Sequence, residues 1–189
     1  MNIQIVPVGE LQENCYILSL EGKDEAVLID PGDEADKILA TLGDLKPVAV
    51  LLTHGHHDHT GALDAFAHLP IYIHPEDARL QQQKHFSAGN YAVEIAPRPK
   101  PTDEVSDGQI IKLAGIIFQV LHTPGHTRGS VCYRSGGDIF TGDTLFDGDY
   151  GRTDLPGGSM AQMRQSLRML LSLHGCHAYP GHGSNMIIP

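Results

Sequence analysis

The chain has no run of basic residues anywhere along its 189 positions. Its 13 lysines and arginines are outnumbered by 23 aspartates and glutamates, which gives a formal net charge of -10. Sequence-independent nucleic-acid binding needs clustered Lys and Arg, so we expect no nucleic-acid partner. No segment approaches the roughly 18 consecutive apolar residues of a membrane span, so we expect no membrane partner either. Residues 1–7 lack the cationic start and long apolar stretch of a signal peptide.

Cysteine is scarce, and its positions exclude the common cysteine sites. Cys15, Cys132 and Cys176 are odd in number, far apart and never in a Cys-x-x-Cys pair. This pattern disfavours a redox role or a zinc–thiolate site. We expect three reduced, buried thiols that pack as small hydrophobes in a cytoplasmic protein.

Length and patterning indicate one α/β (α+β) domain spanning residues 1–189. Apolar runs and turn residues predict two successive halves, each made of strands followed by helix. The first half has predicted strands at 3–8, 15–20, 25–29, 48–52 and 71–73. Its predicted helices span 34–42, 60–67, and a polar stretch from a cap at 74–77 to about 83. The second half has predicted strands at 109–113, 116–121, 130–134 and 138–140, a helix at 159–173, and a short strand before 180. Two sheets packed face to face with helices outside would bury both halves.

Residues 84–109 are the least regular part of the chain, with three prolines between 97 and 101. We interpret them as a long surface loop that could form a wall of a substrate pocket, because long loops in compact domains are often functional. His85, Arg98 and Lys100 in this segment are expected to be solvated surface residues.

The central feature is a histidine-rich loop that directly follows the apolar run 48–52. His54, His56, Asp58 and His59 are spaced His-x-His-x-Asp-His. In extended backbone, residues two apart point the same way, so His54 and His56 can share one metal ion. Asp58 and His59 lie further along, beside a predicted helix start, and can turn toward a second ion.

Potential ligands also follow three other strands of the predicted sheets. His126, Asp143 and His182 each come after a strand and a sharp turn. Asp30 ends a further strand at the same edge, where it is either a turn residue or an acceptor that orients a ligand histidine. Because open α/β sheets place their chemistry at strand ends, we expect these residues to gather in one site.

Seven nitrogen and oxygen ligands exceed one tetrahedral site but suit two ions that share a bridge. The predicted division is His54, His56 and His126 for one ion, Asp58, His59 and His182 for the other, and Asp143 between them. Two such ions can trap a hydroxide at neutral pH, which predicts a hydrolase. Nitrogen and oxygen donors accept zinc, which we expect, and also iron or manganese. A domain that only stores metal would not need the bridging carboxylate.

Three motifs give the sequence a family resemblance. The loop Thr-His-x-His-x-Asp-His at 53–59, Thr-Pro-Gly-His-Thr at 123–127 and Gly-Asp-Thr-Leu-Phe at 142–146 resemble the metallo-β-lactamase superfamily. They look most like its glyoxalase II branch, the hydroxyacylglutathione hydrolases. The resemblance implies a four-layer αββα sandwich, the same seven metal ligands, and hydrolysis of a thioester such as S-lactoylglutathione. Asp58 would both hold the second ion and accept a hydrogen bond from the attacking hydroxide.

Departures from that family pattern bear on the substrate. The chain ends seven residues after His182, so we expect no C-terminal helical domain of the kind that contacts glutathione in longer enzymes. Where those enzymes have Gly-Lys-x-Tyr, residues 151–154 are Gly-Arg-Thr-Asp, and Arg152 is the predicted anion contact. These features favour a small-molecule thioester whose thiol half needs fewer contacts with the protein than glutathione, or another ester or thioester.

Two other activities of the superfamily are alternatives to thioester hydrolysis. Persulfide dioxygenases share the Gly-Arg-Thr-Asp segment but hold one iron at positions matching His54, His126 and Asp143. They usually carry Cys where this chain has Ser130, which favours the hydrolase. Most true β-lactamases of this fold lack an aspartate at the position of Asp143, which disfavours antibiotic hydrolysis.

Overall fold

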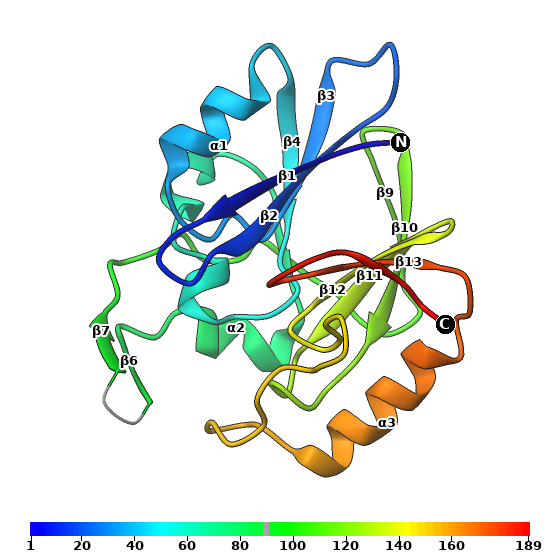
Figure 1. Ribbon diagram of the computed structural model, residues 1–189. Helices are drawn as coiled ribbons and strands as arrows, with labels where there is room; N and C mark the ends of the chain where they lie inside the picture. Colours follow the sequence, from blue (N-terminus) through cyan, green and yellow to red (C-terminus); the bar gives the residue numbers. More distant parts are fainter. Residues whose placement is uncertain (89–90) are drawn as a thin grey trace.

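The computed structural model describes residues 1–88 and 91–189, which form two six-stranded mixed sheets packed face to face (Figure 1). The first sheet has the order β1 (Asn2–Val8), β2 (Glu13–Ser19), β3 (Glu25–Ile29), β4 (Lys46–Leu51), β5 (Ile71–Ile73) and β8 (Asp103–Glu104). The second has the order β14 (Met186–Ile187), β13 (His177–Pro180), β12 (Asp138–Gly142), β11 (Val131–Ser135), β10 (Ile116–His122) and β9 (Ile110–Leu113).

Helices cover the outer face of each sheet (Figure 1). Helix α1 (Ala35–Leu42), helix α2 (Pro75–Gln81) and the short 3-10 helix η2 (Leu63–Phe66) pack on the first sheet. Helix α3 (Met160–Leu171) packs on the second sheet. A third apolar cluster fills the space between the sheets. The predicted four-layer αββα sandwich is therefore confirmed.

Strand β2 shows how the sequence builds these layers. All seven of its residues are buried, as expected for a strand covered on both faces. Tyr16 and Leu18 point between the sheets, whereas Cys15 and Ile17 point toward the helices, following the two-residue period of a strand. All three cysteines are free and buried, as predicted. No helix within the described ranges is long and apolar enough to cross a membrane.

Parallel strand pairs bring the functional loops to one edge. Strands β3 and β4 run parallel, so Asp30 and the loop after Leu51 leave the first sheet side by side. Strands β12 and β13 are also parallel, which brings Asp143 and the loop after Pro180 together in the second sheet. The two edges are joined across the interface, because the Tyr16 hydroxyl donates to the Pro180 carbonyl over 2.5 Å.

The helix predicted directly after the histidine loop is wrong. Two 3-10 turns, η1 (His57–His59) and η2, replace it. The Thr60 hydroxyl donates to the His56 carbonyl, and the Ala62 amide donates to the Pro31 carbonyl outside the segment. Groups that an α-helix would pair internally are thus taken by side-chain and tertiary contacts.

The prediction of a loop over 84–109 is also partly wrong. Strands β6 (His85–Ala88) and β7 (Tyr91–Glu94) form an antiparallel hairpin that extends from the body of the protein (Figure 1), and β8 follows. The part of the predicted loop at 89–90 lies outside the described residues. Arg98 is half-buried rather than solvated, and its guanidinium donates to the Thr60 hydroxyl and the His57 carbonyl. His85 and Lys100 are exposed, as predicted.

Neighbouring residues of β10 allow the inter-sheet packing to be tested. Phe118 is fully buried between the sheets, whereas Ile117 is 56% exposed on the opposite face. Phe118→Ala should lower the free energy of unfolding by about 3–5 kcal/mol, because a large cavity replaces the ring. The matched Ile117→Ala should change it by less than about 0.5 kcal/mol. Urea denaturation followed by circular dichroism measures both, and equal losses would contradict this assignment of the two faces.

Candidate metal centre

Three histidines from two loops form the first group of potential ligands. His54 and His56 follow β4, and His126 follows β10. His54 Nε2 lies 3.1 Å from His56 Nδ1, which lies 2.8 Å from His126 Nε2. All three side chains are buried, and one nitrogen from each converges on a common space where a cation fits.

A second group lies beside the first. Asp58, His59 and His182 bring ligand atoms within 4.8 Å of one another. Asp58 Oδ2 is 3.3 Å from His182 Nε2 and 3.8 Å from His59 Nε2. The groups are those into which the sequence divided these residues.

Asp143 lies between the two groups. Its Oδ1 is 3.3 Å from His59 Nε2, and its Oδ2 is 3.4 Å from His126 Nε2 and 3.7 Å from His182 Nε2. The carboxylate thus faces both groups at once, which is the geometry that a bridging ligand requires. Across the described residues, His59 Nε2 and Asp143 Oδ1 are buried and have no hydrogen-bond partner. Buried polar atoms are normally satisfied, so this pair fits a metal-binding role.

The other ring nitrogen of four histidines meets an acceptor. These Nδ1 contacts are His54 to Thr53 Oγ1 at 3.1 Å, His59 to Asp30 Oδ2 at 3.0 Å, His126 to the Arg152 carbonyl at 2.7 Å, and His182 to the Leu11 carbonyl at 3.1 Å. We assign the proton of each ring to Nδ1, since the carbonyl and carboxylate partners can only accept. Each Nε2 is then left free to face the centre.

Asp30 sits beneath this loop in the position expected of an orienting acceptor. It accepts from the Thr53 amide over 2.7 Å and the Thr53 hydroxyl over 2.5 Å, besides its contact with His59. The Thr53 hydroxyl hydrogen points to Asp30, so its lone pairs face His54. Asp30 therefore contacts His59 of the second group directly and His54 of the first group through the Thr53 hydroxyl.

Electrostatics divide the histidines into two kinds. Burial lowers the pKa of His54 well below its ordinary value and that of His56 to about 3, so both rings are neutral at pH 7. Burial also lowers the pKa of His59 and His182, but nearby Asp143 and Asp58 outweigh it and raise both pKa values. In the metal-free protein, protons on the second group would balance the carboxylates.

Glu13 was missed by the sequence reasoning. It is fully buried at the start of β2, and its Oε1 lies 3.7 Å from His59 Nδ1. Burial raises the pKa of this carboxyl well above its ordinary value. No sequence motif marks Glu13 as part of a site, because its contact with His59 joins a strand to a loop far along the chain.

A cavity of about 640 Å³ opens onto both groups and includes Asp143 and Arg152 in its lining. Its apolar wall consists of Leu11, Phe86, Phe146 and Leu155. Phe86 comes from β6, so the 84–109 segment contributes a residue to the wall of this cavity. The exposed Arg152 guanidinium makes two 2.8 Å contacts with the Asp154 carboxylate.

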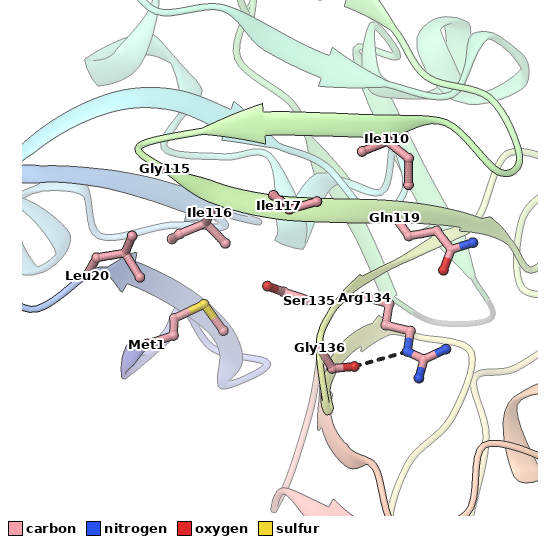
Figure 2. Close-up of a pocket in the computed structure, with 10 residues that line it drawn as sticks. All are labelled: Met1, Leu20, Ile110, Gly115, Ile116, Ile117, Gln119, Arg134, Ser135 and Gly136. Carbon is pink, nitrogen blue, oxygen red and sulfur yellow. Dashed lines mark hydrogen bonds between the residues drawn. The ribbon is translucent and has the colours of Figure 1, made fainter.

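A second hollow, of about 530 Å³, lies at the other end of the strands (Figure 2). It is lined by Ile116 at the start of β10, by Leu20, and by Arg134, which donates to the Gly136 carbonyl. Strand β10 leads from this hollow toward the metal centre. Within the described chain its lining contains no His, Asp, Glu or Cys, so it is not part of the centre.

Comparisons with known proteins agree with this geometry. The sequence profile of the metallo-beta-lactamase superfamily matches residues 8–182. The hydroxyacylglutathione hydrolase GloC of Haemophilus influenzae is 36% identical, covering 97% of this chain and 92% of its own. The crystal structure of BLEG-1, a B3 metallo-beta-lactamase, has a TM-score of 0.91 at 31% identity, covering 99% and 94%. The di-iron-bound structure of TTHA1623 has a TM-score of 0.81 at 38% identity, covering 98% and 94%.

Metal binding should release protons from His59 and His182. His59 and His182 have raised pKa values, so a cation must displace their protons, whereas His54 and His56 are already neutral. At pH 7 we expect between about one and two protons released with one of two ions, and affinity for that ion falling as pH is lowered. Zinc titration calorimetry in buffers of different ionisation enthalpy measures this release. Equal enthalpies in all buffers for both ions would contradict it.

Proposed function

This chain belongs to the metallo-beta-lactamase superfamily, and from that basis we propose that it is a two-metal hydrolase of acyl thioesters, of the glyoxalase II type. The family and the histidine-rich centre together make it a metal-dependent hydrolase. The position of Asp143 carries the two-metal proposal, because its carboxylate oxygens face both ligand groups. An enzyme with one ion in the first group would leave Asp58 and His182 with no metal ion to bind.

The thioester assignment is supported by similarity to GloC over nearly the full length of both chains. We propose zinc as the metal, and the same nitrogen and oxygen donors also suit iron or manganese. TTHA1623 holds two irons in its crystal structure. The free, buried cysteines support a reducing, cytoplasmic location.

Bound divalent cations would supply Lewis-acid polarisation and a water of lowered pKa. The seven residues would hold these cations beside the cavity, with Asp143 facing both groups. Asp58 lines the cavity and has an additional role, which is to accept a proton or hydrogen bond from the attacking water. Burial raises the pKa of Asp58, but His59 and a hydrogen bond from His182 lower it by more, so Asp58 stays ionised and able to accept a hydrogen bond.

The lining of the cavity supports a proposal for substrate recognition. Arg152 is proposed to contact an anionic group of the substrate at the rim. Its charge is shared with Asp154, so a substrate carboxylate has to compete for the guanidinium. The walls around it are largely apolar. We therefore propose S-lactoylglutathione as a substrate, together with acyl thioesters whose thiol half is uncharged.

A second candidate is β-lactam hydrolysis, because BLEG-1 has a TM-score of 0.91 to this chain. The two activities use the same kind of cation-activated water but differ in the acyl group. The bridging position of Asp143 supports the thioester, since most β-lactamases of this fold are expected to lack an aspartate there.

The proposal is tested by assaying fully metallated protein against three substrates: S-lactoylglutathione, an acyl thioester of an uncharged thiol, and a chromogenic cephalosporin. We expect two metal ions per chain and hydrolysis of both thioesters with a higher kcat/KM than for the cephalosporin. Cephalosporin turnover without thioester turnover would establish the second candidate instead. Oxygen consumption with glutathione persulfide would identify a dioxygenase.

Asp58→Asn should lower kcat for thioesters by about 10²–10⁴-fold, because the amide is a poorer acceptor for the water proton. Circular dichroism should show an unchanged fold, and metal analysis at saturating zinc separates lost metal from lost chemistry. Asp64→Asn is the matched control, since Asp64 is exposed six residues further along the chain. Wild-type kcat in a fully metallated Asp58→Asn protein would remove Asp58 from the mechanism.

A further inference from the structure

Asp77 is a buried carboxylate wedged between the two loops that carry the first ligand group. It lies in the first turn of α2 and is 1% exposed. Its Oδ2 accepts from the Gly55 amide over 2.9 Å and from the Thr127 hydroxyl over 2.7 Å. Its Oδ1 accepts from the Gly129 amide over 2.7 Å. Three donors from two distant loops therefore converge on one side chain.

Two of the three donors are direct neighbours of the histidines of the first group. Gly55 lies between His54 and His56 in the chain, and Thr127 directly follows His126. Asp77 thus contacts a direct chain neighbour of each of the three histidines in the first group. Asp58 and His59 of the second group lie further along the same loop, and within the described residues the Asp77 carboxylate makes its hydrogen bonds to Gly55, Thr127 and Gly129 rather than to that part of the chain.

Both amides reach Asp77 because the donating residues are glycines. A Cβ at Gly129 would lie 2.6 Å from Asp77 Oδ1, and one at Gly55 would lie 2.7 Å from the Asp77 carbonyl oxygen. Either side chain would push α2 away from the loops. The loop sequences are therefore built for close approach to this helix.

A carboxylate suits this position better than any neutral side chain. Two oxygens accept from all three donors, whereas an asparagine would offer one oxygen and turn its NH₂ group toward an amide or hydroxyl donor. Burial raises the pKa of the Asp77 carboxyl, and the hydrogen bonds from Thr127, Gly55 and Gly129 oppose that rise. The Thr127 hydroxyl also lies 2.7 Å from the Ser130 hydroxyl, which extends the network toward β11.

We propose that Asp77 is a positioning residue that holds the His54–His56 loop and the His126 loop at the separation needed to bind the first metal ion. This inference rests on the proposed metal-dependent function. Because the hydrogen bonds of the Asp77 carboxylate lie beside the ligands of the first group, its loss should affect that ion selectively. A residue that merely stabilised the fold would weaken both sites together or leave both affinities unchanged.

The test compares Asp77→Ala, Thr127→Val and the control Glu76→Gln, which alters an exposed carboxylate on the same helix. Each metal-free protein is titrated with zinc against a competing chelator. We expect Asp77→Ala to weaken one of two sites by about 10–100-fold and leave the other unchanged. Thr127→Val should weaken the same site less, Thr127→Ser should restore it, and Glu76→Gln should match wild type. Excess zinc should restore most of the thioesterase kcat.

The affected ion is identified in a His182→Ala background, which removes a ligand of the second group. There the remaining tight ion should lose affinity when Asp77→Ala is added, and the visible spectrum of the cobalt-substituted protein should change with it. Equal weakening of both sites, or a lower melting temperature with unchanged affinities, would overturn the inference.

Two further outcomes remain decisive. If Asp77→Ala does not fold, Thr127→Val carries the test, because it keeps the carboxylate and removes one donor. If wild type binds a single ion, the two-metal proposal fails, while the role of Asp77 is still judged by the affinity of that ion.

Discussion

The His59 ring is buried among carboxyl groups from four segments of the chain: Asp30 at 3.0 Å, Asp143 at 3.3 Å, Glu13 at 3.7 Å and Asp58 at 3.8 Å. Negative groups held this closely away from water repel one another unless positive charge lies among them. A proton on His59 provides part of that charge in the metal-free protein, and a divalent cation provides more. A cation bound at this edge would therefore relieve part of the repulsion among these carboxylates.

Rigid surroundings keep that crowded edge in one arrangement. The candidate ligands follow strands whose inner faces are buried between the sheets, so their backbone positions follow from the packing of the sheets. Thr53, Asp30 and two backbone carbonyls hold the outward nitrogens of the histidines. The charged side chains of Arg98 and Asp77 fasten opposite ends of the histidine loop to neighbouring segments. Such support lowers the conformational entropy that metal binding would otherwise have to remove.

The substrate side of the centre is built differently. Its walls come from the β6–β7 hairpin, the loop after β1 and the segment after β12, which belong to neither the strand ladders around the ligands nor the helices. Connecting segments vary with little cost to the fold, and they carry specificity in many scaffolds. The chain is similar both to a hydroxyacylglutathione hydrolase and to a B3 metallo-beta-lactamase, and one fold can host different functions on such connecting segments.

The sequence by itself determined the layers and the grouping of the histidines. Alternating apolar residues in strands such as β2 specify two covered faces, and the spacing of His54 and His56 on extended backbone places both on one side. These are local properties, decided within a few residues. The roles of Glu13, Arg98 and Asp77 were decided only by the tertiary structure, because each acts on residues 22 or more positions away. The turns after the histidine loop followed the same rule, since the Pro31 carbonyl took the amide that a helix would have used. Local patterns select elements, but the partner of a buried polar group depends on which segments the completed fold brings together.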